Sequence, residues 1–410
     1  MLHIAWLGKK SPFCGNVTYS REITNALLER KYQVSFLHFA QETADLEKTQ
    51  EWNLTLDQWE LEAKGVSQSP FNSHTPMTCE VPLPCLYKSQ IYTIPTFKSS
   101  KVLMQSLRQL RPDVVHASLT LSPLDFVLPE ICEELEIPLV ATFHPAFDRK
   151  LRNLTSGTQH LTYQLYAPFL ANYDRVIVFS QIQRDILVKL GVPGERVAVI
   201  PNGVDPLKYA PGPSAFKAEL NAERVFVYQG RIAPEKNVEA LLKAWKSAEM
   251  PASSRLVIVG DGPLAATLRM YYNEESGIEW FGFIGDEQRR IEILRGSDVF
   301  ILPSFVEGLS LSLLEGMACG LACLATDVGA DGEVLAGGAG VVLNPQKVST
   351  QLQTLLPLFC DHPELGFLLG QKARQRVLER YTLSGNISQV EALYEGVIRK
   401  QGVEYQMYTR

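Results

Sequence analysis

Residues 297–315 read SDVFILPSFVEGLSLSLLE, an apolar run followed by a break and a second apolar stretch. The run Val299–Leu302 is typical of a buried strand in a parallel sheet, and Pro303 would end it. A helix is expected to begin at Leu309. The segment therefore predicts a βα unit, in which the strand end and the helix N-terminus lie next to each other.

Glu307 and Glu315 flank the start of this expected helix. At about 1.5 Å of rise per residue, a mostly helical stretch separates them by up to ~12 Å. A helix N-terminus binds phosphate through free N–H groups, and carboxylates accept hydrogen bonds from sugar hydroxyls. A nucleotide sugar has this layout. Two solvated helix glutamates are the simpler interpretation of the pair taken alone.

Length and composition limit the class of protein. A chain of 410 residues is too long for one ordinary core, so two domains of about 200 residues are expected. Its formal charge of −6 predicts no nucleic-acid partner. No apolar run approaches the roughly 18 residues that cross a membrane, so any membrane contact would be peripheral.

The cysteines give no sign of a disulfide framework or a metal site. They are odd in number, without a paired CxxC spacing, at positions 14, 79, 85, 132, 319, 323 and 360. We expect free thiols in a reducing compartment. The chain starts directly on a strand-like stretch, so a protein that is not secreted is expected, with its four N-x-[ST] triplets arising by chance.

Short apolar runs alternate with segments of helical period, the pattern of parallel α/β sheets. The strands expected in the first half are 3–7, 34–39, 114–117, 139–143 and 175–179. Those expected in the second half are 225–229, 256–259, 278–281, 299–302 and 321–325. A Pro- and Gly-rich linker is expected at 201–216. The sequence predicts two Rossmann-like domains facing each other across a cleft, with a ligand at the carboxyl ends of both sheets.

Residues 42–98 form the least regular part of the chain and contain many aromatic residues and prolines. An insertion of this length in an α/β domain is usually functional or disordered, and this one is too aromatic to favour disorder. It predicts either a wall of the acceptor site or a small satellite core.

Loops at the expected strand ends carry the candidate ligand-binding residues. The stretch QGRIAPEKN, residues 229–237, supplies Arg231 and Lys236, which could both reach a diphosphate. The first loop, residues 8–16, is glycine-rich but lacks the dinucleotide pattern GxGxxG. His144 ends a first-half strand and would face the cleft. For the two cations the alternative is a solvated surface, and for the histidine it is a structural role.

These motifs in this order resemble the retaining glycosyltransferases of family 4, which have the GT-B fold. The matching stretches are the Gly15 loop, the strand end at His144, IPNGVD at 200–205, GRIAPEKN at 230–237, VGDGP at 259–263, FGFIG at 281–285, SDVFILPS at 297–304 and EGLSLSLLE at 307–315. The resemblance implies an acceptor-binding domain at 1–205 and a nucleotide-sugar-binding domain at 206–385. A helix near 385–400 would cross back, so that 386–410 complete the first domain.

The resemblance also implies roles for individual residues. Arg231 and Lys236 would neutralise the departing diphosphate, Glu307 would contact the transferred sugar, and His144 would contact the sugar or the leaving phosphate as the fourth catalytic residue. Glu315 would hold the ribose, and Ile284 in FGFIG would meet the base through its backbone. The donor-binding set is Gly15, Asn16, Gly230, Ile284, Leu309, Ser310, Leu311 and Glu315.

Family members retain the anomeric configuration by front-face attack, in which the leaving phosphate takes the proton of the acceptor. No strong protein base is then required, and the absence of a DxD motif implies no metal or other cofactor. Two departures from the family pattern stand out. Gly15 is followed by Asn16 where adjacent glycines are frequent, and Ala322 stands where proline is frequent.

Residues 86–126 resemble the lipid galactosyltransferases of photosynthetic membranes, which make digalactosyldiacylglycerol from the monogalactosyl lipid. This resemblance implies UDP-galactose as donor, a membrane glycolipid as acceptor, and a peripheral position on the cytoplasmic face of a thylakoid or plasma membrane. Two alternatives stay open: a family 4 enzyme with a soluble or cell-envelope acceptor, and a catalytically silent nucleotide-sugar-binding scaffold.

A candidate membrane surface follows independently from the charge pattern. Cations lie beside an apolar stripe (Leu103, Leu107 and Leu110) on an expected helix, at Lys98, Lys101, Arg108 and Arg111. Such a helix can rest on an anionic membrane, with about 1 kcal/mol from each cation. Arg149, Lys150 and Arg152 form a second positive cluster. The alternative is a helix whose apolar side faces the core.

Overall fold

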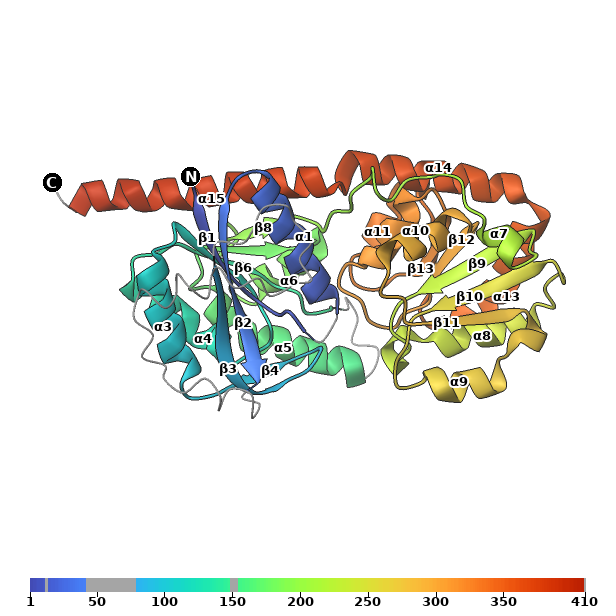
Figure 1. The fold of residues 1–410 in the computed structure, drawn as a ribbon, viewed down its shortest axis with the longest axis horizontal. Coiled ribbons are helices and arrows are strands. Elements are labelled where there is room, and N and C mark those ends of the chain that lie inside the picture. The colour runs from blue at the N-terminus through green and yellow to red at the C-terminus, as the bar shows by residue number, and fades with distance from the viewer. Residues whose placement is uncertain (12–13, 42–78, 148–153, 409–410) are drawn as a thin grey trace.

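The computed structural model describes residues 1–11, 14–41, 79–147 and 154–408. They form two α/β domains that lie side by side along the longest axis of the molecule (Figure 1). The predicted GT-B architecture, two Rossmann-like domains with parallel sheets, is confirmed.

The first domain is built on a sheet of eight described strands in the order β4-β3-β2-β1-β5-β6-β7-β8. All neighbours pair in parallel except β3 and β4. The strands are β1 (His3–Gly8), β2 (Gln33–Gln41), β3 (Cys79–Lys88), β4 (Thr93–Pro95), β5 (Val114–Ser118), β6 (Leu139–Thr142), β7 (Arg175–Val178) and β8 (Val197–Val199). The strand order reverses at β1, so a crevice for ligands is expected outside the carboxyl ends of β1 and β5.

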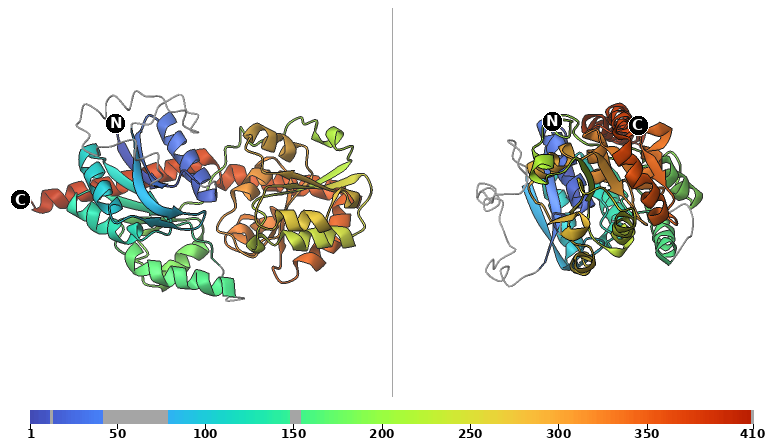
Figure 2. Two further views of the ribbon diagram at one scale, coloured as in Figure 1. Left: turned by 60° about the horizontal axis from the view of Figure 1, so that its bottom comes forward. Right: turned by 90° about the vertical axis from the view of Figure 1, so that its right-hand side faces the viewer.

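Helices cover both faces of this sheet (Figures 1 and 2). They are α1 (Gly15–Glu29), α3 (Ser99–Leu110), α4 (Leu124–Glu134), α5 (Leu154–Leu170) and α6 (Gln181–Lys189). Helix α3 packs against β3 and α4. Because the strands are covered on both sides, β1 and β5 are buried along nearly their whole length, and their sequences are accordingly continuous apolar runs.

The second domain has a parallel sheet of six described strands in the order β11-β10-β9-β12-β13-β14. They are β9 (Arg224–Gln229), β10 (Ser254–Val259), β11 (Ile278–Gly282), β12 (Val299–Leu302), β13 (Ala322–Thr326) and β14 (Val341–Leu343). The helices around them are α7 (Phe216–Glu219), η2 (Pro234–Lys236), α8 (Val238–Ser247), α9 (Ala265–Tyr271), η3 (Glu274–Ser276), α10 (Glu287–Arg295), α11 (Leu311–Ala318), α12 (Asp331–Val334), η4 (Ala336–Gly338), α13 (Val348–Asp361) and α14 (Pro363–Arg380). The order reverses between β9 and β12, which places the ends of these two strands at the switch point.

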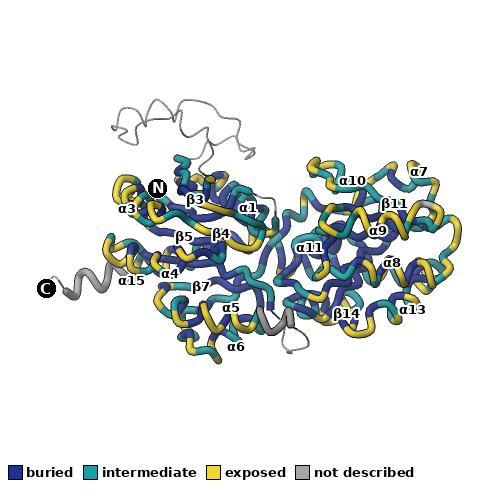
Figure 3. Tube along the Cα trace, turned by 90° about the horizontal axis from the view of Figure 1, so that it is seen from below, coloured by how far each residue is buried: buried dark blue, intermediate teal, exposed yellow. Residues whose placement is uncertain are grey.

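The burial pattern separates an interior from a solvent-exposed shell in each domain (Figure 3). Strand β12 is buried at every position, as the apolar run 299–302 predicts. Exposed residues gather on the outer faces of the surrounding helices, among them α8 and α13. Polar residues that follow the central strands of the second sheet are also buried, among them Ser304 and Glu307, so their side chains need hydrogen-bond partners.

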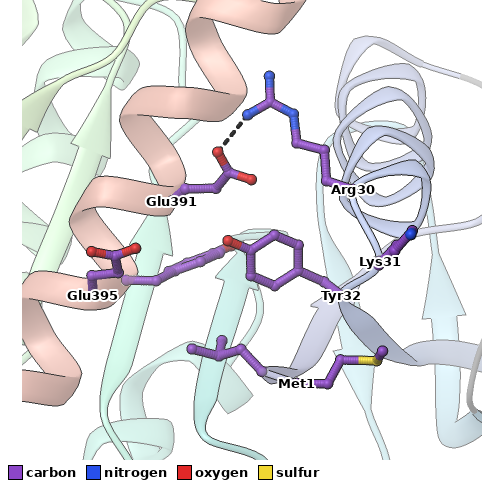
Figure 4. Close-up of a pocket in the computed structure, with 8 residues that line it drawn as sticks. Met1, Arg30, Lys31, Tyr32, Glu391 and Glu395 are labelled. Carbon is purple, nitrogen blue, oxygen red and sulfur yellow. Dashed lines mark hydrogen bonds and ion pairs between the residues drawn. The ribbon is translucent and has the colours of Figure 1, made fainter.

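The last helix, α15 (Leu383–Tyr408), returns to the first domain as predicted and packs against α1. The chain passes between the domains twice, once after β8 and once before α15. The two passages lie side by side, because Val204 pairs with Thr382 in a parallel bridge. A cavity of about 330 Å³ opens at the seam between α15 and the first domain, lined by Tyr32, Arg30 and Glu391 among others (Figure 4). Arg30 and Glu391 form an ion pair across this seam. The cavity is remote from the strand ends that carry the candidate site.

Four strands were missed by the sequence analysis: β3, β4, β8 and β14. The first two fall in the stretch 42–98, which is therefore partly an extension of the main sheet and not wholly an irregular insertion. Prolines at positions 82 and 84 of β3 disguise it, because proline is uncommon in strands. The proposed acceptor wall falls partly on residues 42–78, which lie outside the described residues.

The predicted membrane helix is corrected by the structure. Its apolar stripe faces the core, since Leu103 and Leu107 are both 0% exposed. Lys98, Lys101 and Arg108 lie on the exposed side, where Arg108 pairs with Glu134. Core burial of the stripe leaves no apolar face on α3 for a bilayer.

Arg149 and Lys150 lie outside the described residues, as does Arg152. None of the helices in the described part of the chain has the length and apolar character needed to cross a membrane.

Candidate donor-binding and catalytic site

The turn from β12 to α11 brings the two predicted glutamates to the carboxyl edge of the second sheet. The helix begins at Leu311, two residues later than predicted, because Ser310 has an extended backbone and acts as its N-cap. The Ser310 hydroxyl accepts a hydrogen bond from the Leu313 N–H at 3.3 Å. An N-capping serine satisfies one of the free N–H groups of a first helical turn.

Glu307 lies in this turn and is only 8% exposed. Its Oε1 accepts hydrogen bonds from Lys236 Nζ at 2.7 Å and from the Ser304 hydroxyl at 2.7 Å. The main-chain carbonyl of Ser304 is in turn held by the Thr326 hydroxyl at 2.6 Å. A carboxylate buried this far needs compensation, which the ammonium supplies.

The predicted cation pair stands beside this carboxylate. Lys236 ends the short helix η2, and Arg231 forms an ion pair with Glu235. Both cations are thus neutralised by glutamates, and neither is a freely solvated surface charge.

Glu315 lies inside α11, where Gln229 Nε2 donates a hydrogen bond to it at 2.7 Å. Burial raises the pKa of Glu315 to about 7, although the nearby Arg290 opposes the shift. Gln229 Oε1 is buried and finds no protein partner among the described residues. Gln229 was not singled out in the sequence, although its place at the end of the run 225–229 could have indicated it.

A second loop that the sequence analysis missed supports the Glu307 turn. A Cβ atom on Gly329 would lie 2.3 Å from the carbonyl oxygen of Glu307, so this position has no room for a side chain. The Ser310 N–H donates to Asp331 Oδ1 at 3.1 Å. Burial raises the pKa of Asp331 well above its usual range, with the charge of Glu307 acting in the same direction.

His144 follows β6 of the first domain, and its main chain lies against the same turn. A Cβ atom on Gly308 would lie 3.4 Å from the His144 carbonyl oxygen. The N–H of Phe147 donates to the Glu307 carbonyl at 3.4 Å. The backbone after β6 thus lies against the Glu307 turn of the other domain, while the His144 imidazole bonds Ser118 in its own domain. The catalytic role of His144 stays a prediction.

The other predicted donor residues are placed at strand ends. The Asn202 amide donates to the Leu309 carbonyl at 3.3 Å. The Gly230 N–H donates to Val259. The Ile284 carbonyl accepts from Arg290 at 2.9 Å, so its oxygen is already engaged. Their contacts with a nucleotide sugar stay predictions, as do those of Leu311 and the first loop.

The predicted residues of the first loop make their contacts within the first domain. Gly15 begins α1, and a Cβ atom there would meet nothing within 4 Å. The amide of Asn16 is engaged within its own domain, by Leu119 and Ser118. No group of three or more His, Cys, Asp or Glu side chains in the described ranges could hold a metal ion.

Glu315→Gln should make stability less dependent on pH. The folded pKa of Glu315 lies above that of an ordinary glutamate, so folding takes up a proton between about pH 4.5 and 7, and stability falls as pH rises through that window. The loss at pH 7 is on the order of 3 kcal/mol. Urea unfolding at pH 5 and pH 8 measures the free energy of unfolding. Relative to the wild type, the variant should be more stable at pH 8 than at pH 5. An equal difference at both pH values would contradict the raised pKa.

Two family models match successive parts of the chain. "Glycosyltransferase Family 4" matches residues 14–207, and "Glycosyl transferases group 1" matches residues 223–361. The first match covers the first domain from α1 through β8, without β1, and the second covers the second sheet.

Curated relatives show the same relationship at low identity. The chain is 28% identical over 179 residues to N-acetyl-alpha-D-glucosaminyl L-malate synthase of Bacillus anthracis, covering 43% of this chain and 47% of that protein. It is 27% identical over 318 residues to UDP-Gal:alpha-D-GlcNAc-diphosphoundecaprenol alpha-1,3-galactosyltransferase of Escherichia coli, covering 74% and 80%. The match thus spans about half the length of the first relative.

Among solved structures, the fold is similar to that of Anabaena Alr3699/HepE in complex with UDP-glucose. The TM-score is 0.72 at 17% identity, with 97% of this chain and 100% of that one covered. The chain thus matches two glycosyltransferase family models in succession and has the GT-B fold.

Proposed function

We propose that the protein transfers a hexose with retention of configuration, galactose from UDP-galactose, onto a membrane glycolipid. The proposed acceptor is monogalactosyldiacylglycerol and the product digalactosyldiacylglycerol. The protein would work peripherally on the cytoplasmic face of a thylakoid or plasma membrane.

The donor half of the proposal rests on the pairing of Lys236 with Glu307 at the switch point of the second sheet. HepE, whose fold is similar, was solved with UDP-glucose, and the Escherichia coli relative is named for UDP-Gal. Arg231 and Lys236 would neutralise the diphosphate, and free N–H groups of the first turn of α11 would face it.

In the proposed reaction, the bond between the anomeric carbon and the β-phosphate oxygen breaks as the acceptor oxygen bonds to the same face of the sugar. The proton of the acceptor hydroxyl passes to the leaving phosphate, so no protein base is consumed. Catalysis then depends on positioning and on stabilising the charge of the leaving group. Glu307 would bind the transferred sugar, and Glu315 would bind the ribose.

One observation carries the lipid acceptor: the hairpin of β3 and β4 exposes large apolar side chains next to the basic start of α3. These residues, termed here the apolar edge, are Leu86, Tyr87, Ile91, Tyr92, Ile94 and Phe97. Lys98 and Lys101 follow directly and are also exposed. Apolar side chains beside cations suit the surface of an anionic bilayer, which the buried stripe of α3 does not.

Removing apolar side chains from this edge should weaken binding to membranes. The double variant Leu86→Ser with Phe97→Ser should lose at least about tenfold in affinity for vesicles of galactolipid with an anionic lipid, since burial of each large side chain contributes about 1.5–3 kcal/mol. Cosedimentation measures it, and Leu207→Ser in the linker, also highly exposed, serves as a control. Unchanged sedimentation of the double variant would rule out the apolar edge as the membrane contact.

A soluble or cell-envelope acceptor is the second candidate, favoured by the Bacillus anthracis relative, which is named N-acetyl-alpha-D-glucosaminyl L-malate synthase. A screen that pairs UDP-, GDP- and ADP-sugars with monogalactosyldiacylglycerol and with soluble acceptors separates the two, with products identified by mass. Transfer only to soluble acceptors would overturn the lipid proposal. A protein that binds UDP-galactose but transfers no sugar would be the catalytically silent scaffold.

A further inference from the structure

The orientation of the Asn16 amide is fixed by its neighbours. Its nitrogen Nδ2 lies 3.0 Å from the carbonyl oxygen of Leu119, and its oxygen Oδ1 lies 3.0 Å from the hydroxyl of Ser118. A carbonyl only accepts hydrogen bonds, so the amide must present its N–H there and its oxygen to Ser118. The reverse orientation would set two oxygens against each other.

The single hydroxyl proton of Ser118 is therefore committed. An amide oxygen only accepts, so Ser118 must donate to Asn16, and every other contact of Ser118 Oγ must bring a proton to it. Ser20 donates its own hydroxyl at 3.2 Å. The third neighbour, His144 Nε2 at 2.8 Å, must carry a hydrogen to form this bond.

We propose that Ser118 and Asn16 hold His144 as the neutral tautomer protonated on Nε2, which leaves Nδ1 as a hydrogen-bond acceptor for the transferred sugar. Both residues are positioning residues, since they act through the imidazole. This inference rests on the proposed function for its chemical meaning, although the tautomer itself does not depend on it. No residue in the described ranges forms a hydrogen bond with Nδ1.

The surroundings of His144 also favour the neutral form. Its ring packs edge-on against Tyr19 at 5.0 Å and near Phe179 at 5.3 Å. Burial lowers the pKa of His144 to about 3, and the ammonium of Lys9 acts in the same direction. The other titratable groups nearby are His116, which its own burial keeps neutral, and Glu307 on the facing turn.

A neutral imidazole that accepts a hydrogen bond suits glycosyl transfer. The sugar develops positive charge in an oxocarbenium-like transition state, which an imidazolium would oppose. A bare Nδ1 can instead accept a hydrogen bond from a sugar hydroxyl and fix the ring. The opposite tautomer would present an N–H in place of that lone pair, and the hydroxyl would have to turn.

Nitrogen NMR of the full chain labelled with ¹⁵N-histidine tests the tautomer without any activity assay. The signals of His144 are identified by their loss in His144→Gln. We expect an N–H-type resonance for Nε2 and a bare-nitrogen resonance for Nδ1, both constant between about pH 5 and 8. A hydrogen on Nδ1, or titration of the ring within that range, would overturn the inference.

Ser118→Ala removes the acceptor that fixes the tautomer. We expect a mixed or reversed tautomer and a kcat about three- to tenfold lower, the effect of one hydrogen bond, with KM for the donor sugar less affected. Ser20→Ala is the matched control: it removes a buried hydroxyl that also bonds Ser118, yet Ser118 still donates to Asn16, so the Nε2 tautomer should persist.

The outcomes separate the two proposals. An Nε2–H tautomer in a protein that transfers no hexose would end the proposed function and leave the inference standing. Hexose transfer by a protein whose His144 carries its hydrogen on Nδ1 would support the proposed function and end the inference. An unchanged His144 tautomer in folded Ser118→Ala would show that Ser118 does not set it.

Discussion

Lys236→Met is expected to lower kcat for sugar transfer by roughly a hundred- to thousandfold, the usual cost of removing one group that stabilises developing charge. The ammonium bonds the buried Glu307, on the side where the proposed diphosphate would leave. Steady-state kinetics with UDP-galactose measures the effect, and product mass confirms the transferred sugar.

Lys243→Met is the matched control for this variant. Lys243 also pairs with a glutamate of the same domain, Glu239, but the pair is exposed on α8. Exposed pairs contribute about 0–1 kcal/mol, so both stability and kcat should stay close to those of the wild type. An equal loss of kcat in the two variants would mean that Lys236 has no special part in the reaction.

A double variant separates the effect of Lys236 on the reaction from its effect on the stability of the fold. Lys236→Met leaves Glu307 buried without its cation, which should destabilise the fold by about 3 kcal/mol. Adding Glu307→Gln removes the unpaired charge and should restore most of that stability without restoring activity. If Glu307→Gln alone behaved like the wild type in every sugar-transfer assay, the silent scaffold would regain support.

The sequence was most informative where the two sheets are apolar. Runs such as 299–302 are buried on both faces of the sheet, so their continuous apolar composition indicates a central strand. The charged residues at the strand ends were also identified, because Arg231, Lys236 and Glu307 follow such runs. The same reasoning failed for β3, where two prolines stand in a strand near the sheet edge.

Local patterns could not reveal partners that are distant in the sequence. Asp331 supports the Glu307 turn through the Ser310 N–H, and nothing near position 331 announces that contact. The membrane helix failed for a related reason: an amphipathic pattern at 99–110 indicates one apolar face, but not whether a sheet or a bilayer covers it. The structure shows that β3 covers it.

Gly260→Ala is expected to destabilise the second domain strongly, by about 3–5 kcal/mol. Gly260 has φ +136°, and a Cβ atom there would lie 1.9 Å from the carbonyl oxygen of Gly230. Both strain and collision must be relieved by moving the loop that carries Arg231. Urea unfolding measures the stability loss.

Activity should fall along with stability, because a shift of about 1 Å in a positioning group can cost on the order of a hundredfold. Gly282→Ala tests a positive φ without a collision: Gly282 has φ +64°, and a Cβ atom there would meet nothing within 4 Å. It should cost only about 1 kcal/mol and leave kcat nearly unchanged. If both alanines cost the same, the close approach of Gly260 to Gly230 would not be what holds the Arg231 loop in place. A larger loss at Gly260, in stability and in kcat together, would tie the geometry of the donor site to one contact between neighbouring strand ends.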